Sequence, residues 1–364
     1  MKMIAEGELR LNFGNDIVTL EIQKELGRGA FGIVSLATDK ETLEQYAVKR
    51  SQCIDANTYF AAAAEIQALM KLDHFNVAKM KAFDFDQNNA LIVMEYCNEG
   101  DLNQRLCRGV EEDTKFQWIR QLFDAMIHLH KMKIVHRDLK PENVLLHNNT
   151  LKLTDFGISR YYNTDTLTEN NLSQFLGTFA GTPYWVAPEV FDRQYTETAD
   201  VFSVGILCYA ILHQESMVYK GQRYFGVFVP HNNQPQVGLG LVMFEENREI
   251  SPSKKYTKNP KMDDLVCALV RMRPLDRPSL ENAMQVLIEI LNGRKEEDNK
   301  QPQQQHHQQH QQQQQQQHHQ QQQHQQQQEE EIDEQNMTWG VWVCLLYTSP
   351  SPRDATLPRM PSSA

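Results

Sequence analysis

The sequence has little positive charge, few cysteines and no long apolar run. Its 36 lysines and arginines are outnumbered by 47 aspartates and glutamates, which gives a formal net charge of −11. Nucleic acids and anionic membranes attract clustered cations, so this acidic balance argues against both as partners. We expect its partners among proteins and nucleotides instead.

No apolar run reaches the roughly 18 residues of a membrane-spanning helix, and the first residues carry charges where a signal peptide would be apolar. The cysteines lie far apart, without the close pairs that zinc sites and disulfide frameworks use. We therefore expect a soluble protein of the cytoplasm, or of the nucleus, with reduced thiols. The cysteines are Cys53, Cys97, Cys107, Cys208, Cys267 and Cys344.

Three zones of different composition follow one another along the chain. Residues 17–293 mix apolar runs, turn residues and charges as a globular domain does, after an N-terminal extension of residues 1–16. Alternating apolar and polar residues predict strands and one helix in residues 17–97, whereas residues 98–293 show mainly helical spacing. A small sheet-rich lobe followed by a larger helical lobe predicts a two-lobed α+β fold.

The second zone, residues 294–342, is rich in glutamine and histidine. It has too little apolar surface to offset its conformational entropy, so we predict a disordered or partly helical tail that is prone to self-association. Metal binding by its histidines is the alternative to low-complexity filler. These histidines are His306, His307, His310, His318, His319 and His324.

The third zone, residues 343–364, turns apolar and then becomes rich in proline, serine and arginine. It resembles a translated sequencing adapter, so we set it aside when predicting the fold. On that interpretation we expect the natural end of the protein to be missing from the sequence.

The first candidate site is a glycine-rich hairpin, in which Gly27, Gly29 and Gly32 would let backbone amides approach phosphate oxygens. These glycines do not open a helix, as those of a dinucleotide-binding fold do, but a hairpin without function would look similar. On the next predicted strand, Lys49 could neutralise phosphates, and Glu65 on the predicted helix could hold its ammonium by an ion pair.

Three longer motifs carry a resemblance to a known family. They are His136-Arg137-Asp138-Leu139-Lys140-Pro141-Glu142-Asn143, Asp155-Phe156-Gly157 and Gly181-Thr182-Pro183-Tyr184-Trp185-Val186-Ala187-Pro188-Glu189. In their order and spacing the chain resembles the eukaryotic protein kinases, from about Ile22 to Leu291. The resemblance implies the two-lobed kinase fold, with ATP and Mg²⁺ as cofactors and proteins as substrates.

The resemblance also assigns catalytic roles. Asp138 is implied as the base that orients and deprotonates the substrate hydroxyl, and Lys140 as the cation that offsets charge on the γ-phosphate. Asn143 and Asp155 are implied as magnesium ligands, since this hard cation prefers oxygen ligands. Together with the lysine–glutamate pair they complete the predicted catalytic set.

A nucleotide pocket is implied in the same way. Its gatekeeper would be Met94, its hinge Glu95 to Cys97, and Asp101 would bind the ribose hydroxyls, although plain strand packing would explain the same apolar residues. The whole predicted set comprises Leu26, Gly27, Gly29, Gly32, Val34, Ala47, Lys49, Met94, Glu95, Cys97 and Asp101.

Further residues are implied as structural supports. Glu189 should form a buried ion pair with Arg277. Asp200 should cap the backbone of the catalytic loop, although Phe202 stands where the family usually has tryptophan. An apolar stack that aligns the two lobes is implied for Leu69, Met80, His136 and Phe156.

Substrate type and regulation follow from the same resemblance. Lys140 and Thr182 fit the pattern of serine/threonine kinases, whereas tyrosine kinases carry a different loop. Arg137 would bind a phosphate on Thr178, added by an upstream kinase or in trans by the same kinase. An unmodified polar loop is the alternative, as is modification of Thr164, Thr166, Thr168 or Ser173.

The sequence departs from the family between residues 213 and 261, where little periodicity is visible and we expect a family-specific insertion. The motif that ends in Ala-Pro-Glu is similar to the Ste20-like and NEK-like branches, but no accessory domain assigns a subfamily. The sequence names no physiological substrate, activating signal or oligomeric state.

Two other classes of function compete with an active kinase. A pseudokinase would bind nucleotide and regulate partners through its fold, but it would normally lack Lys49, Asp138 or Asp155, and all three are present. An assembly protein that acts through its Gln/His tract would not need the catalytic set.

Overall fold

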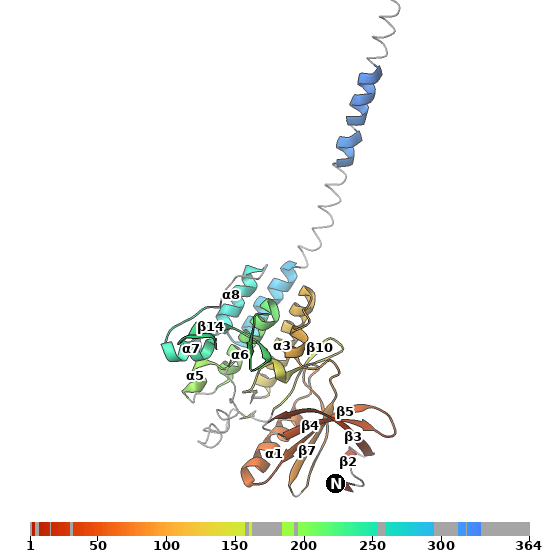
Figure 1. Cartoon of the computed structure of the whole chain (residues 1–364), viewed down its shortest axis with the longest axis vertical. Helices are drawn as coiled ribbons and strands as arrows, with labels where there is room; N and C mark the ends of the chain where they lie inside the picture. The colour runs from red at the N-terminus through yellow and green to blue at the C-terminus, as the bar shows by residue number, and fades with distance from the viewer. Residues whose placement is uncertain are drawn as a thin grey trace, which may run out of the picture. The chain divides into compact units, whose positions relative to one another are not determined.

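An antiparallel sheet of seven strands forms the first part of the folded chain (Figure 1). The chain divides into two compact units, Met1–Asn292 and Gly293–Ala364, and the first contains both predicted lobes. The computed structural model describes residues 2–3, 7–14, 16–29, 32–86, 88–156, 160–161, 184–192, 196–252, 259–294, 312–317 and 319–328.

Each strand of the sheet pairs antiparallel with its neighbour, in the order β1-β2-β3-β4-β5-β7-β6. In β7 every residue from Ala90 to Met94 is buried, and such a continuous apolar run suits a strand covered on both faces. The strands are β1 (Lys2–Met3), β2 (Glu8–Phe13), β3 (Asp16–Gly29), β4 (Gly32–Asp39), β5 (Gln45–Gln52), β6 (Met80–Phe85) and β7 (Asn89–Glu95).

One helix, α1 (Ala56–Lys71), packs on this sheet and carries Glu65. Its N-cap residue, Asp55, accepts a hydrogen bond from the Thr58 amide at 2.8 Å, and the Thr58 hydroxyl accepts one from the Asp55 amide at 3.1 Å. This capping box satisfies two backbone donors that would otherwise lack partners. The helix therefore begins at a fixed residue, which sets where Glu65 lies along it.

Helices dominate the rest of the first unit. In α6 (Glu197–His213) every residue from Ala199 to Leu212 is buried, and α3 and α8 pack against it. A helix that is apolar all round suits the centre of a large lobe. The predicted two-lobed α+β fold is confirmed. The other elements are α2 (Leu102–Leu106), α3 (Glu112–Lys131), β8 (Ile134–Val135), η1 (Pro141–Asn143), β9 (Val144–His147), β10 (Thr150–Leu153), β11 (Arg160–Tyr161), α5 (Pro188–Phe191), α7 (Leu239–Glu246), α8 (Pro260–Leu269), η2 (Pro274–Asp276) and helical residues 280–294.

Two β-hairpins precede α7, in the segment for which we expected an insertion without periodicity. The first joins β12 (Ser216–Tyr219) to β13 (Gln222–Phe225), and the second joins β14 (Phe228–His231) to β15 (Gln234–Gly238). The segment is therefore regularly folded, although its sequence shows little periodicity.

The turns of these hairpins explain why periodicity alone misses them. Both central residues have positive φ, at Lys220 (49°) and Gly221 (81°) in the first turn and at Asn232 (46°) and Asn233 (62°) in the second. Left-handed conformations at both positions are typical of the type I′ hairpin turn, which favours asparagine and glycine. The signal in the sequence was thus the dipeptide between two short strands.

The sheet also includes residues that the sequence prediction placed before the domain. Strand β2 pairs with β3 along its whole length, and its Leu9 and Leu11 are only 1% and 3% exposed. Both belong to an apolar cluster with residues of the neighbouring strands, among them Leu20, Tyr46 and Leu91. Residues 7–14 are therefore part of the folded lobe, and the predicted boundary at residue 17 falls inside the sheet.

The second unit contains helical residues 312–317 and 319–328, all glutamine or histidine and all exposed. The prediction left disorder and partial helix open for this tail, and at these residues the structure has helix. Residues 343–364 lie outside the described residues. Within the described residues, no helix combines the length and the apolar character needed to span a bilayer.

Replacing Leu9 by alanine should destabilise the protein, because removing buried methyl groups costs about 2–5 kcal/mol of unfolding free energy. The matched control is Ile17→Ala on β3, since Ile17 is 56% exposed and should change stability by less than about 0.5 kcal/mol. Denaturant unfolding followed by circular dichroism measures both. Equal effects of the two substitutions would show that residues 7–14 do not belong to the core.

Candidate active site

Three charged side chains from separate elements meet at one point. The ammonium of Lys49, on β5, lies 2.6 Å from Glu65 Oε1 on α1 and 2.9 Å from Asp155 Oδ1, two residues beyond β10. Lys49 and Glu65 are 4% and 3% exposed. The structure thus brings together the two residues that the sequence paired, and it adds Asp155 as a second partner of the lysine.

Burial and mutual attraction oppose each other in this cluster. Burial alone would lower the pKa of the Lys49 ammonium, but the two carboxylates outweigh it and the pKa is raised. Burial raises the pKa of Glu65 despite the lysine. For Asp155 the lysine outweighs burial and the pKa is lowered. A fixed cation and a fixed anion therefore lie side by side at neutral pH.

The glycine-rich hairpin is formed by β3 and β4, with Gly29 paired to Gly32. Gly32 has a φ of 129°, and a Cβ there would overlap the carbonyl oxygen of Arg50, so only glycine fits this position. A Cβ at Gly27 or Gly29 would meet nothing within 4 Å. Packing therefore requires glycine at position 32, whereas it does not explain why positions 27 and 29 are glycine.

The remaining residues of the predicted nucleotide set lie on adjacent strands of the sheet. Val34 pairs with Lys49 across β4 and β5, and Ala47 pairs with Met94 across β5 and β7. Leu26 lies on β3 and is 40% exposed. The register of three strands therefore brings this part of the set together.

The predicted hinge begins at the end of β7 and is held by its own carboxylate. Glu95 accepts hydrogen bonds from the Lys79 amide at 2.8 Å and from the Lys152 ammonium at 3.0 Å. Lys152 lies on β10 and is 8% exposed, so this pair ties the hinge to the strand that leads to Asp155. Burial raises the pKa of Cys97 to about 12, which keeps its thiol protonated.

Asp101, the predicted ribose ligand, caps helix α2. Its Oδ1 accepts a hydrogen bond from the Gln104 amide at 2.7 Å, and its Oδ2 accepts one from the Gln104 side chain at 2.9 Å. Burial raises the pKa of this carboxyl despite the bonds to Gln104. Since a carboxylate has about four acceptor positions, Asp101 could accept hydrogen bonds from a ribose while it still caps the helix.

The predicted catalytic loop lies between β8 and β9. Asp138 Oδ2 accepts hydrogen bonds from the Lys140 ammonium at 2.7 Å and from the Asn143 side-chain amide at 3.0 Å. The main-chain carbonyl of Asn143 accepts a hydrogen bond from the Thr154 amide at 3.0 Å. The structure therefore brings the three loop residues together and joins them to the residue before Asp155.

Asp200, at the start of α6, holds this loop in place. Its carboxylate accepts hydrogen bonds from the His136 amide at 2.8 Å and the Arg137 amide at 3.0 Å, and it lies 3.2 Å from His130 Nε2. Burial alone would raise the pKa of Asp200, but His130, His136 and the Arg137 amide outweigh it and the pKa is lowered. Arg137 has a φ of 71°, an uncommon conformation that these fixed amides help to maintain.

Asn143 and Asp155 offer a donor set that fits magnesium. The Asn143 side-chain nitrogen donates to Asp138, so the side-chain oxygen of Asn143 remains as a metal ligand. Asp155 contacts Lys49 through Oδ1, so its Oδ2 remains as a second ligand. In the described residues, no group of three or more His, Cys, Asp or Glu could hold a metal by itself. Two oxygen donors suit a Mg²⁺ ion that also binds phosphates and water.

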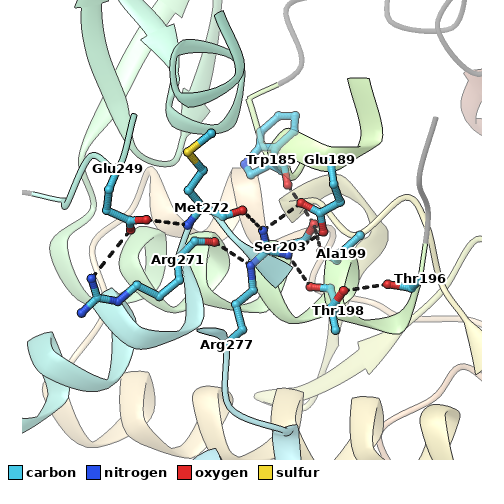
Figure 2. Close-up of polar contacts among 10 residues, drawn as sticks. All are labelled: Trp185, Glu189, Thr196, Thr198, Ala199, Ser203, Glu249, Arg271, Met272 and Arg277. Carbon is cyan, nitrogen blue, oxygen red and sulfur yellow. Dashed lines mark hydrogen bonds and ion pairs between the residues drawn. The ribbon is translucent and has the colours of Figure 1, made fainter. Parts of the chain in front are cut away.

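Figure 2 shows how Arg277 supports the larger lobe. Its terminal nitrogens donate to the Glu189 carboxylate at 2.6 and 2.8 Å, and its guanidinium lies 5.0 Å from the ring centroid of Phe202. All five guanidinium donors have an acceptor, so this buried cation is fully satisfied. The other three acceptors are the main-chain carbonyl oxygens of Thr198, Arg271 and Met272.

The two hairpins that the sequence did not predict pack against Tyr184 and Trp185. The Trp185 indole donates to the Phe225 carbonyl at 2.9 Å, and the Tyr184 ring lies 5.3 Å from Tyr224 and 5.4 Å from Phe228 between centroids. This aromatic cluster supports the chain just before the Ala-Pro-Glu motif. The two turn dipeptides are the sequence signal from which these hairpins could have been predicted.

The predicted stack between the lobes is partly visible as direct contacts. The rings of His136 and Phe156 lie 5.1 Å apart between centroids. Leu69 and Phe156 belong to one apolar cluster, against which Met80 packs. Thr178, its alternatives and Thr182 lie outside the described residues.

Comparison with known proteins defines the class. Residues 20–289 match the model of the protein kinase domain, and the chain belongs to the protein kinase family. Similar proteins include one described as "Probable myosin light chain kinase" from Dictyostelium discoideum, 35% identical over 205 residues. Others are "Aurora kinase" from Yarrowia lipolytica, 35% identical over 199 residues, and "Serine/threonine-protein kinase Nek3" from Mus musculus, 32% identical over 196 residues.

These alignments cover only part of each protein. They span 53%, 53% and 52% of this chain and 62%, 51% and 37% of the three relatives, in the same order. Each therefore covers less than two thirds of the relative's own length.

Glu142 is the least satisfied carboxyl of the catalytic loop. Its Oε2 is buried without a hydrogen-bond partner among the described residues, and burial raises its pKa to about 7. Because this value lies above the usual 4.5, protonation of Glu142 stabilises the fold. That contribution is fully present below about pH 4.5 and is lost as the pH rises through about 7.

Glu142→Gln should therefore be more stable than the wild type at pH 8, by up to about 3 kcal/mol, and nearly equal to it at pH 5. The glutamine stays neutral at both pH values, so a buried charge lowers the unfolding free energy of the wild type alone. Urea unfolding at the two pH values measures the difference, with the exposed Glu41→Gln as control. A stability difference between Glu142→Gln and the wild type that is the same at pH 5 and pH 8 would contradict the raised pKa of Glu142.

Proposed function

We propose that this protein is a serine/threonine kinase that transfers the γ-phosphate of ATP to hydroxyl groups of protein substrates. The observation that carries the proposal is the junction of Lys49 with two carboxylates, next to the loop that holds Asp138. Phosphoryl transfer needs positioned groups and neutralised charge rather than a covalent intermediate. In this arrangement Lys49 would neutralise charge and Asp138 would position the substrate hydroxyl.

ATP would bind under the hairpin of β3 and β4, with its adenine against the hinge. Lys49 would pair with the α- and β-phosphates while Glu65 fixes its ammonium. Gly27 and Gly29, which packing does not require, would let backbone amides reach the phosphate oxygens. Asp101 would accept hydrogen bonds from the ribose.

In the transfer, the substrate hydroxyl oxygen forms a bond to the γ-phosphorus while the bond from that phosphorus to the bridging oxygen breaks. ADP leaves with the electron pair of the broken bond. The hydroxyl proton passes to Asp138, and Lys140, 2.7 Å from that carboxylate, offsets charge on the moving phosphate. Magnesium, when bound through Asn143 and Asp155, would neutralise the phosphate oxygens.

The choice of serine and threonine is supported by Lys140 in the catalytic loop and by the relative whose name includes "Serine/threonine-protein kinase". We expect proteins as substrates. An upstream kinase or a second copy of the chain would be the regulatory partner, and the Gln/His tract would allow self-association. The described cysteines form no disulfide bond, which fits a reducing compartment such as the cytoplasm.

Regulation would act through Arg137, whose guanidinium would bind a phosphate on Thr178. Since Asp200 holds the Arg137 amide, such a phosphate would be tied to the same loop that carries the base. Phosphorylation would then order the segment that receives the substrate.

Asp138→Asn should lower phosphate transfer about 10²–10⁴-fold, because the amide cannot accept the substrate proton. Transfer of labelled γ-phosphate from ATP with magnesium to a generic protein substrate measures this, followed by phosphoamino-acid analysis. The control is Asp276→Asn, an exposed carboxylate of the same lobe, which should keep full activity. Equal incorporation by wild type and Asp138→Asn would contradict the assignment, and absence of transfer by either would favour a pseudokinase.

Incubation with ATP should activate the wild type and leave Thr178→Ala at its starting rate. The threonine hydroxyl is the proposed acceptor of the activating phosphate, and alanine removes it. Initial rates before and after incubation measure the effect. Thr166→Ala, which removes an alternative acceptor in the same sequence segment, should be activated as the wild type is. Full activation of Thr178→Ala would remove Thr178 from the proposal.

A further inference from the structure

A polar cavity in the first unit takes no part in the proposed transfer. It has a volume of about 440 Å³ and is lined by residues 98–100, Gln104, Arg105, Arg108 and Asn149. These residues come from the segment after the hinge, from helix α2 and its end, and from the turn between β9 and β10. Cavities of roughly 300–1,000 Å³ accommodate drug-sized ligands, so this one has room for more than a single small ion.

Arg105 is a cation fixed in advance at this cavity. Its Nη1 donates to the Gly109 carbonyl at 2.6 Å, and its guanidinium lies 5.5 Å from the ring centroid of Trp118. Trp118 is fully buried and donates to the Asn149 carbonyl at 3.0 Å. A guanidinium has five donors, and among the described residues only Gly109 accepts from this one. Most of its donors thus remain for a ligand.

Arg108 adds a second, exposed guanidinium three residues further along the chain. No described residue pairs with its side chain. The one carboxylate of the lining, Glu99, accepts from the Asn149 amide through both oxygens, at 3.1 and 3.2 Å. Two cations and one engaged anion give the lining a net positive charge, in a chain whose formal net charge is −11.

We propose that this cavity is a docking site for an acidic segment of a protein partner. The planar fork of arginine matches a carboxylate with two parallel hydrogen bonds, so the two guanidiniums would bind glutamate or aspartate side chains. The side-chain amides of Asn98 and Asn149 would bind the peptide backbone. A segment held there would raise the local concentration of its protein without contacting the residues of the transfer.

The docking does not rest on the proposed function, because it can be measured without nucleotide. Fluorescein-labelled short peptides of alternating glutamate and glycine are titrated with the full chain at physiological salt, and anisotropy is recorded. Peptides with lysine or glutamine in place of glutamate serve as ligand controls. We expect the glutamate peptide to bind and the other two to bind at least about tenfold more weakly.

Arg108→Glu should weaken binding of the glutamate peptide by about tenfold or more, and Arg108→Lys should fall between it and the wild type because the charge stays and the fork is lost. The matched control is Arg273→Glu, an exposed arginine elsewhere in the chain, which should bind as the wild type does. Thermal unfolding should be the same for all variants, because both arginines lie at the surface.

Three outcomes would overturn the proposal. Equal weakening by Arg108→Glu and Arg273→Glu would indicate unspecific attraction to the whole surface. Equal binding of the glutamate and lysine peptides would show that charge does not select the ligand. Complete displacement of the peptide by inorganic phosphate at low millimolar concentration would assign the cavity to a small oxyanion instead.

Discussion

The buried ammonium of Lys49 is the constraint on which the rest of the site depends. Removing Lys49 and the Glu65 carboxylate from water costs several kcal/mol per ion unless their contacts compensate. The ammonium lies 2.6 Å from Glu65 and 2.9 Å from Asp155, whose side chain stays 30% exposed. The three groups come from β5, from α1 and from the residues after β10. Their compensation is therefore complete only when the sheet, helix α1 and the residues after β10 are all in place.

Other buried charges extend the same logic into the larger lobe. Asp200 holds two amides of the catalytic loop, and Arg277 uses every donor for Glu189 and three carbonyl oxygens (Figure 2). At the predicted hinge, the Lys152 ammonium donates to Glu95. Each of these groups would be left as an unpaired buried charge if its partner moved, so together they fix the backbone around the site.

Much of the site could be predicted because its residues lie in short motifs whose spacing follows from their chemistry. Asp138, Lys140 and Asn143 meet within one loop, and Asp55 begins a helix of which Glu65 is part. The two-lobed fold was predictable from the change of periodicity along the chain, and the family match over residues 20–289 confirms the class.

What the sequence did not predict depends on contacts between distant residues. Lys152 and Glu95 are 57 positions apart, and nothing in either strand marks the pair. The burial of Leu9 follows from the pairing of β2 with β3, which no local pattern requires. The hairpins before α7 are an exception, since their turn dipeptides are a local signal that a search for helical or alternating periodicity does not detect.

The most direct test of this account is the rate of phosphate transfer by Lys49→Met. Methionine fills similar space but removes the cation that the two carboxylates hold and that we propose pairs with the phosphates of ATP. The account predicts a fall of about 10²-fold or more, with thermal unfolding first showing that the variant is folded. A folded Lys49→Met protein that transfers phosphate within about twofold of the wild-type rate would contradict it.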